Sequence, residues 1–416
     1  MRFLHTSDWH LGRPLATLTA VYSRQEEQRA FIDELERICD EKAIDFIIVA
    51  GDVYDSFNPP AAAEKLFYDA LMRLGKNGRR PIIVISGNHD SPDKLTVARP
   101  LAGELGIALF GNPKSAPALP AGGRVIGTGE LCVELDIRGE RAVVAALPYV
   151  NETRLDEILF DLASSSEADM RRGYSEKIRR LFEAASARFR GDAVNLAAAH
   201  FYITGGTVSG SEENMKIGGV YAVDADSLPA RAQYIAMGHL HRAQKCAGTD
   251  RAHYCGSPFC FDRDEAGAAK YVYVVDVEAG GQAAVERVPL TDYKPIYRFS
   301  ARSPEEAEEY CGPHRDENCW IFITLCTSDA LAASGADELR RKYKNIAEIE
   351  IALPGEYADQ AGGLENAADV RSMYDAFAIG QAFKDFYAQT KHAEPDPELL
   401  ELFLDLCEVA DEADNA

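Results

Sequence analysis

The sequence predicts a layered α/β protein in which short buried strands alternate with amphipathic helices. Three runs, at 2–6, 46–50 and 81–86, are short, apolar and rich in β-branched residues, which is typical of buried strands. In the segments between these runs, apolar residues recur with the period of a helix. Polar side chains directly follow each run. The repeated order of strand, helix and strand favours a layered sheet with right-handed crossovers.

The helices that we expect between these strands have clear apolar stripes. Phe31, Leu35 and Ile38 are spaced by four and three residues, as on one face of a helix. A second helix is predicted after Pro59-Pro60, which suits a helix start. Its stripe either packs on the sheet or forms a dimer contact, and it consists of Leu66, Phe67, Ala70, Leu71 and Leu74. Residues 105–150 read as shorter strands broken by glycine.

A further helical stretch between 151 and 191 combines an apolar stripe with a basic face. The basic side chains are Arg171, Arg172, Lys177, Arg179, Arg180, Arg188 and Arg190. This face is either an ordinary solvated helix surface or a place for phosphate contacts.

The chain divides into three predicted parts. Residues 1–290 form the main domain, and residues 291–355 read as a small β-α-β-α-β domain without a constellation of ligands. Residues 356–416 contain a linker and two amphipathic helical stretches. These stretches either fold back on the body or dock on a partner.

Composition excludes several classes of protein. The 416 residues carry a net charge of −23, which argues against holding nucleic acid by bulk electrostatics. Part of this excess is local, since 394–416 holds nine acidic and no basic residues. No signal peptide or membrane span is recognisable. The nine cysteines form no CxxC pair, so we expect reduced core thiols in a cytoplasmic protein.

Polar residues at strand ends are the strongest functional signal. Five of the nine histidines lie there, and Asp8-x-His10 and His239-x-His241 each place two ligands on one side of an extended segment. The whole set comprises Asp8, His10, Asp52, Asn88, His89, His200, His239 and His241. Such a set predicts a site for two metals with Asp52 shared between them. Mixed nitrogen and oxygen ligands suit manganese, iron or zinc better than magnesium, and manganese is our prediction.

The neighbouring polar residues have other expected roles. Asp90 is expected to orient His89 by its charge. Asp55 is expected to cap a helix or turn. The remaining histidines, His5, His253, His314 and His392, are predicted to be structural or surface residues.

The motifs D-x-H, G-D, G-N-H-D, a lone histidine and G-H-x-H occur here in the order found in the calcineurin-like metallophosphoesterases, and residues 1–290 resemble that family. The resemblance implies a β-sandwich flanked by helices, a small α+β capping domain and a helical carboxyl-terminal tail. It also implies that Asp8, His10, Asp52 and His241 hold one metal, and Asp52, Asn88, His200 and His239 the other. His89 would then be the catalytic residue, placed over the scissile phosphate.

The fuller strings, such as Thr6 to Gly12 and Gly87 to Pro92, are similar to those of a nuclease group within this family. The resemblance implies manganese-dependent exonuclease and hairpin-opening endonuclease activity at DNA ends, in recombination, repair and replication. It also implies a homodimer that works with an ATPase docked on the carboxyl-terminal helices. The predicted DNA-binding residues are Arg13, Arg171, Arg172, Lys177 and Arg242.

Two other functions fit the same residues. A phosphodiesterase acting on nucleotides or small phosphodiesters would use the same two metals, although it needs neither the extra domain nor the acidic tail. A regulatory scaffold with a dead site is the non-enzymatic alternative, and the complete ligand set argues against it.

Overall fold

The computed structural model describes residues 1–17, 20–114, 116–117, 124–155, 166–209, 221–326 and 332–352. The predicted linker and docking helices at 356–416, including His392, lie outside these described residues.

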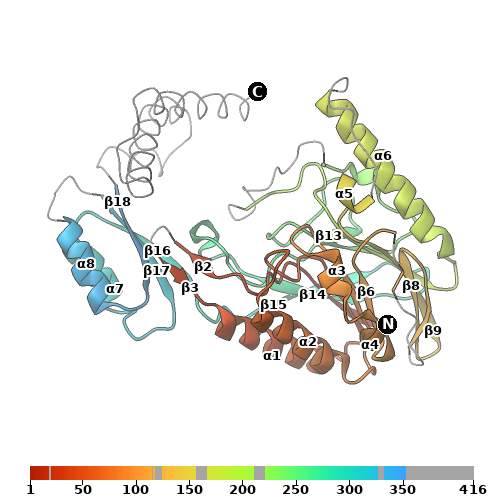
Figure 1. Ribbon diagram of the computed structural model, residues 1–416, viewed down its shortest axis with the longest axis horizontal. Helices are drawn as coiled ribbons and strands as arrows, with labels where there is room; N and C mark the ends of the chain where they lie inside the picture. The colour runs from red at the N-terminus through yellow and green to blue at the C-terminus, as the bar shows by residue number, and fades with distance from the viewer. Residues whose placement is uncertain are drawn as a thin grey trace, which may run out of the picture.

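Two β-sheets packed face to face form the body of the protein (Figure 1). The first has the order β15 (Ala284–Pro289), β14 (Tyr271–Asp276), β1 (Arg2–Thr6), β4 (Phe46–Ala50), β5 (Ile82–Ile85) and β6 (Ile107–Phe110). The second has the order β12 (Gln244–Lys245), β13 (Ala252–Tyr254), β11 (Tyr234–Gly238), β10 (Val194–His200), β9 (Glu140–Leu147), β8 (Cys132–Ile137) and β7 (Val125–Thr128). The β-sandwich expected from the resemblance is therefore present.

Strand β4 explains why the sequence runs are apolar throughout. Ile47 and Val49 point outward into the core under the helices, whereas Ile48 and Ala50 point inward into the core between the two sheets. Successive side chains of a strand alternate between its faces, and both faces are covered here. Because neither face meets water, the run needs no polar alternation.

Helices cover the outer face of each sheet (Figure 1). The first sheet carries α1 (Gln25–Glu41), α2 (Ala61–Gly75), α3 (Pro92–Thr96) and α4 (Arg99–Glu104), and the second carries α5 (Glu152–Leu155) and α6 (Glu167–Ala185). The predicted stripe of α2 packs on the sheet, since Phe67, Ala70, Leu71 and Leu74 are buried in that core. The described ranges also contain the short 3₁₀ helices Ser186–Arg188, Ala225–Ser227 and Arg263–Glu265.

A second, smaller unit follows β15. Its sheet has the order β16 (Ile296–Ala301), β17 (Trp320–Cys326) and β18 (Ile346–Ala352), and its helices are α7 (Pro304–Cys311) and α8 (Ala332–Lys342). Both strand pairings are parallel, so this predicted β-α-β-α-β unit is described more closely as α/β than as α+β.

The small unit contacts the body through a separate apolar cluster. Trp320 and Phe322 of β17 are buried there together with Leu15 and Cys260 of the body. The Tyr22 hydroxyl of the hairpin formed by β2 (Leu15–Ala16) and β3 (Val21–Tyr22) donates to the Ala347 carbonyl at 3.1 Å. Figure 1 shows this hairpin beside the small sheet.

The cysteines behave as predicted within the described residues. All eight of these cysteines are free thiols, and all but Cys326 are buried. A search of the described residues for membrane spans found no helix with the length and apolar character to cross a bilayer.

Candidate metal centre

The carboxyl ends of five strands meet at one edge of the sandwich. Asp8 and His10 follow β1, Asp52 follows β4, Asn88 follows β5, His200 ends β10, and His239 and His241 follow β11. The two sheets are tied together there, because the His239 N–H donates to Asp8 Oδ1 at 2.9 Å. The structure thus brings together all seven residues predicted as metal ligands.

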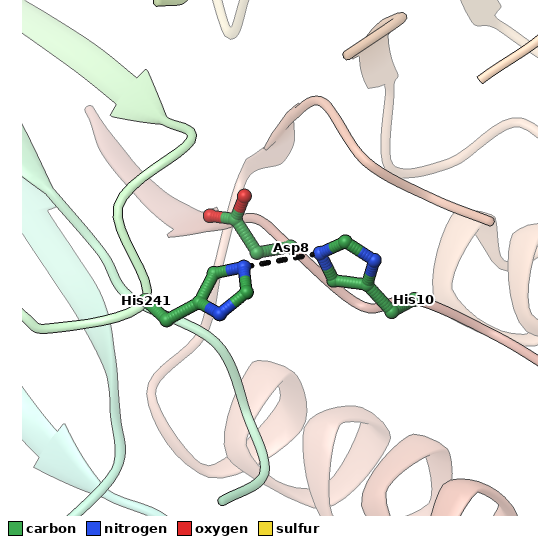
Figure 2. Close-up of side chains that lie close together, drawn as sticks. All are labelled: Asp8, His10 and His241. Atoms are coloured by element: carbon green, nitrogen blue, oxygen red, sulfur yellow. Dashed lines mark hydrogen bonds between the residues drawn. The ribbon is translucent and has the colours of Figure 1, made fainter. Parts of the chain in front are cut away.

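One group consists of Asp8, His10 and His241, whose ligand atoms lie within 4.8 Å of one another. In Figure 2 one nitrogen of each imidazole ring points toward the other ring, and Nε2 of His10 lies 3.2 Å from Nε2 of His241. Asp52 Oδ2 lies 3.6 Å from the same His10 nitrogen. Asp52 therefore borders this group from the second strand end.

A second group surrounds the side chain of Asn88. Its Oδ1 atom lies 3.0 Å from His200 Nε2 and 2.9 Å from His239 Nδ1. Asp52 Oδ2 is 3.2 Å from the same His200 nitrogen. Asp52 is the member common to both groups, as expected for a shared carboxylate.

The donor atoms of the second group fit a metal ion better than they fit one another. His200 Nδ1 lies 2.8 Å from the Ala50 carbonyl, to which only a protonated ring nitrogen can donate. In the neutral ring, His200 Nε2 then carries a lone pair that points at Asn88 Oδ1 and Asp52 Oδ2, and both of these oxygens also bear lone pairs. Asp52 Oδ2 is fully buried and has no hydrogen-bond partner among the described residues. A cation between these atoms would satisfy all of them, and the nitrogen and oxygen set suits a transition metal.

Burial sets the protonation of the histidines. It lowers the pKa of His10 and of His241, and that of His239 to about 3, so these rings are neutral with lone pairs available. Burial would also lower the pKa of His200, but the Asp52 carboxylate outweighs it and raises the pKa to about 9. Without a metal this ring is therefore charged near neutral pH, and a bound metal would take the place of the Nε2 proton that faces Asp52.

The two carboxylates differ. Burial raises the pKa of Asp8 to about 7, whereas His200 and His89 overcome the cost of burial and keep the pKa of Asp52 well below its usual range. Protons and metal ions therefore compete for the same atoms.

The backbone at this edge adopts rarely populated conformations. Asp8, His10, Asp52 and His239 have positive φ angles of 53°, 43°, 49° and 101°. Such angles disfavour residues with a Cβ and are typical of functional sites, where the surrounding structure compensates for the strain. Glycine permits the approach of the strands, since a Cβ at Gly238 would lie 1.9 Å from the Ala50 carbonyl oxygen.

His89 is half-buried at the edge of the two groups. Its backbone N–H donates to Asp52 Oδ1 at 2.8 Å, and its Nδ1 lies 2.8 Å from the Asp55 carbonyl oxygen. An Nδ1–H bonded to that carbonyl leaves Nε2 as the nitrogen that can act on a substrate. The ring centroid lies 4.8 Å from that of His10, so the imidazole of His89 lies beside the predicted metal ligands.

Two expectations about the neighbouring carboxylates were wrong. Asp90 does not orient His89, because its carboxylate accepts the backbone N–H groups of Val53, Tyr54 and Gly87 at 2.8–3.1 Å. It holds two strand ends together instead, and burial raises its pKa to about 6. Asp55 caps none of the described helices; its Oδ1 lies 3.5 Å from His10 Nδ1.

Arg154 is a residue of this edge that sequence reasoning missed. Its buried guanidinium donates to the Gly87 carbonyl at 2.8 Å, to the Asp90 carbonyl at 2.7 Å and to Ser86 Oγ at 3.0 Å. The turn that carries Asn88 and His89 is thereby fixed from α5, which packs on the second sheet. Its position shortly after a strand end was the only available signal.

Phe261 was missed as well. Its ring centroid lies 5.1 Å from that of His10 and 5.2 Å from that of His241. The Arg13 guanidinium carbon lies 4.4 Å from the same ring centroid. An apolar ring therefore shields one side of the first group of ligands.

The predicted DNA-binding residues lie in different places. Arg13 is beside the metal ligands, and the exposed Arg242 directly follows His241. Arg171, Arg172 and Lys177 lie on α6, which covers the outer face of the second sheet. On this helix Arg172 pairs with Asp169 at 2.7 Å and Arg180 with Glu176 at 3.1 Å. Such pairs are typical of an ordinary solvated helix face.

Comparison with known proteins gives a consistent result. A family model described as Calcineurin-like phosphoesterase matches residues 1–243. The SbcD subunit of nuclease SbcCD from Bacillus subtilis is 40% identical over 418 residues, which is 100% of each chain. The protein of the same name from Rhodobacter capsulatus is 35% identical over 73% of this chain and 72% of its own, and that of Escherichia coli K12 is 29% identical over 85% and 84%.

Proposed function

The chain belongs to the calcineurin-like phosphoesterases and, within them, to the SbcD family of SbcCD nuclease subunits, and from this premise we propose that it cleaves DNA at two divalent metal ions. This is the nuclease group that the fuller motif strings resemble. The observation that carries the proposal is the buried Asp52 Oδ2, which has no hydrogen-bond partner in the described part of the chain and lies 3.6 Å from His10 Nε2 and 3.2 Å from His200 Nε2.

Seven residues would hold the metals. Asp8, His10, Asp52 and His241 form the first set, and Asp52, Asn88, His200 and His239 form the second. Two bound metals lower the pKa of water and neutralise the charge that develops on a phosphoryl group. Manganese is the metal that we propose, because it accepts both nitrogen and oxygen ligands.

His89 is the proposed catalytic residue. Its backbone is fixed by Asp52 and its Nδ1 by the Asp55 carbonyl, so the imidazole has a defined orientation. Nε2 then either stabilises charge on the scissile phosphate or gives a proton to the leaving oxygen. In this proposal His89 acts only on the substrate and is not a metal ligand.

The biological setting follows from the family. The relatives are named as the SbcD component of the SbcCD nuclease, so we propose an SbcC-type ATPase as the partner, with docking through the carboxyl-terminal helices. DNA ends and hairpins are the proposed substrates, in recombination, repair and replication. We further propose a homodimer in the cytoplasm. Residues 1–290 would be the nuclease domain, 291–355 the capping domain and 356–416 the docking segment.

The decisive experiment measures cleavage of end-labelled duplex and hairpin DNA with manganese or magnesium, beside hydrolysis of a chromogenic phosphodiester. The variants are His89→Leu and the control His314→Leu, which changes a histidine of the small unit that pairs with Glu317. We expect His89→Leu to lose about 10²- to 10⁴-fold in DNA cleavage. It should retain the metal content of the wild type, measured by elemental analysis.

Two outcomes would contradict the proposal. Hydrolysis of the small ester with DNA left intact, even with the ATPase added, would favour the phosphodiesterase of small substrates. Equal activity of His89→Leu and wild type would remove His89 from the mechanism.

A further inference from the structure

A cavity of about 300 Å³ beside the metal centre has an unusual lining. Three arginines, Arg13, Arg24 and Arg29, border it, and none of the described residues that line it is acidic. The chain as a whole carries a net charge of −23, so this concentration of positive charge runs against its composition. Such a cavity is within the size range of small-ligand sites.

The cavity is connected to the metal centre through Asp55. Its Oδ1 lies 3.5 Å from His10 Nδ1 and 3.7 Å from Arg13 Nε. Gln28 of α1 fixes the intervening loop, because its Oε1 accepts the Gly12 N–H at 3.2 Å. Two lining residues, Gly12 and Arg13, thus lie within three positions of the predicted ligand His10, and a ligand held by Arg13 would lie on that side of the metal centre.

The three arginines have different roles. Arg24 is buried, donates to Glu27 at 3.0 Å and to the Cys260 carbonyl at 2.6 Å, and so has its charge compensated. Arg13 stacks over Phe261 and is only 22% exposed. Arg29 is exposed, and within the described ranges no acidic side chain forms an ion pair with it. Arg29 is thus the cation that no described carboxylate pairs with, and Arg13, whose Nε lies 3.7 Å from Asp55 Oδ1 and so beyond hydrogen-bond distance, is the second cation that can meet a phosphate.

The remaining wall of the cavity is apolar. It is formed by Pro14, Val21, Pro60 and Leu66 together with Ala62 and Ala63. Val21, one of these lining residues, is 71% exposed, so its side chain is open to contact with a ligand. Aliphatic side chains on one wall and arginines on the other suit a ligand with an apolar face and a charged phosphate, and a nucleotide has both.

We propose that this cavity binds one unpaired nucleotide of the DNA strand next to the scissile phosphate. Arg13 and Arg29 contact its phosphate, and the apolar wall contacts its base. The inference rests on the proposed function and adds to it a preference for ends with unpaired nucleotides. It also explains how an acidic chain holds DNA locally, without a basic surface.

The test introduces one negative charge into the cavity and compares two adjacent positions of α2. Ala61 and Ala62 are both exposed in the first turn of α2, but only Ala62 lines the cavity. Glutamate is favourable near a helix start, so neither Ala61→Glu nor Ala62→Glu should disturb folding. Binding is measured by fluorescence anisotropy in chelator, with a duplex carrying a four-nucleotide single-stranded tail and with the same duplex made blunt.

We expect the wild type and Ala61→Glu to bind the tailed duplex more tightly than the blunt one. Ala62→Glu should lose about tenfold in affinity for the tailed duplex, the effect of one lost base contact. Equal behaviour of the two variants, or no preference in the wild type, would overturn the proposal. Tighter binding of free thymidine monophosphate than of the tail would also overturn it, in favour of a site for free nucleotides.

This outcome is separate from the proposed nuclease function. Binding is measured without metal, so it does not depend on cleavage. A wild type that cleaves DNA but ignores the tail would overturn only the cavity assignment. A wild type that prefers the tail but cleaves no DNA with manganese and the ATPase would overturn only the nuclease function.

Discussion

The described residues contain two clusters of buried histidines, and of these two only the cluster at the strand ends has the arrangement of a metal site. At the strand ends, His10, His200, His239 and His241 surround Asp52. In the core between the sheets, His5 and His253 lie among Tyr234 and Tyr273 instead. The His5 and Tyr234 side chains are hydrogen-bonded at 2.9 Å, and His253 stacks on the Tyr234 ring at 5.2 Å.

The comparison shows which property identifies a site. Burial lowers the pKa of His239 and of His5 alike, to about 3 in each case. His5 Nε2 and His253 Nδ1 are also buried, and neither has a hydrogen-bond partner among the residues that the structure describes. What distinguishes the strand-end cluster is a carboxylate directed at its ring nitrogens, together with strained backbone at three of its members, His10, Asp52 and His239. Convergence of ligands, rather than perturbed titration, therefore marks the metal centre.

The largest effect is expected from removing the Asp52 carboxylate, which distinguishes the strand-end cluster from the other cluster. Asp52→Asn keeps the shape of the side chain but removes the negative charge that both metal groups share. We expect loss of metal from both groups and a fall of about 10³-fold in cleavage of DNA, because charge stabilisation at the phosphate is lost. Elemental analysis and the cleavage assay measure the two effects.

Asp45→Asn is the matched control, since Asp45 is a buried carboxylate next to the opposite end of the same strand. It accepts the Arg2 N–H at 3.0 Å and pairs with Arg138 at 2.9 Å. This variant should retain its metals. Two metals bound to Asp52→Asn would contradict the assignment of Asp52 as the shared ligand.

A smaller effect is expected from Arg154, which holds a ligand turn without touching the metals. Arg154→Lys keeps the charge but cannot reach Gly87, Asp90 and Ser86 at once. We expect a loss of about 10- to 100-fold in kcat with little change in KM, as for other residues that orient ligands. Steady-state kinetics on the chromogenic phosphodiester measure this change.

Arg80→Lys provides the control for this variant. Arg80 is also buried, and it donates to three backbone carbonyls, those of Ile44, Leu74 and Cys39. It precedes β5, whereas Ser86, Gly87 and Asp90, which Arg154 contacts, follow that strand. Its replacement should lower stability without lowering kcat. If both variants lost kcat equally, Arg154 would act through general stability rather than through the turn.

That the polar residues at the strand ends meet at one edge was predictable from the sequence, because their signal is local. Asp52 follows Gly51 at the end of an apolar run, and His239 follows Gly238 in the same way, so strand ends and ligands are recognisable together. Period-two alternation, however, could not be seen in runs whose two faces are both buried. The existence of the strands was therefore predictable from composition and length, while their assignment to two facing sheets rested on the family resemblance.

The missed contacts are distant in sequence. Arg154 reaches Gly87 over 67 residues, and Asp90 reaches Val53 over 37. Neither pairing leaves a local pattern, since an arginine after a strand and an aspartate after a histidine are both common. Asp90 was wrongly expected to orient His89 because sequence proximity suggested a contact that the turn does not make.

The smallest effect on activity is expected at His5 of the other histidine cluster. The substitution His5→Phe should leave DNA cleavage within about twofold of the wild type. The unfolded chain binds a proton at His5 near pH 6.5, while the folded chain does so only near pH 3. Between these values the unfolded state binds more protons, so the free energy of unfolding falls as pH falls, by about 3 kcal/mol from pH 7 to pH 4. His5→Phe removes this term and loses the bond to Tyr234, which costs about 1 kcal/mol at any pH. The variant should therefore be less stable than the wild type at pH 7 and more stable at pH 4, as measured by urea unfolding. If the free energies of unfolding of the two proteins changed with pH in parallel, His5 would not be held neutral by its surroundings. Burial would then not lower the pKa of the histidines in both clusters alike.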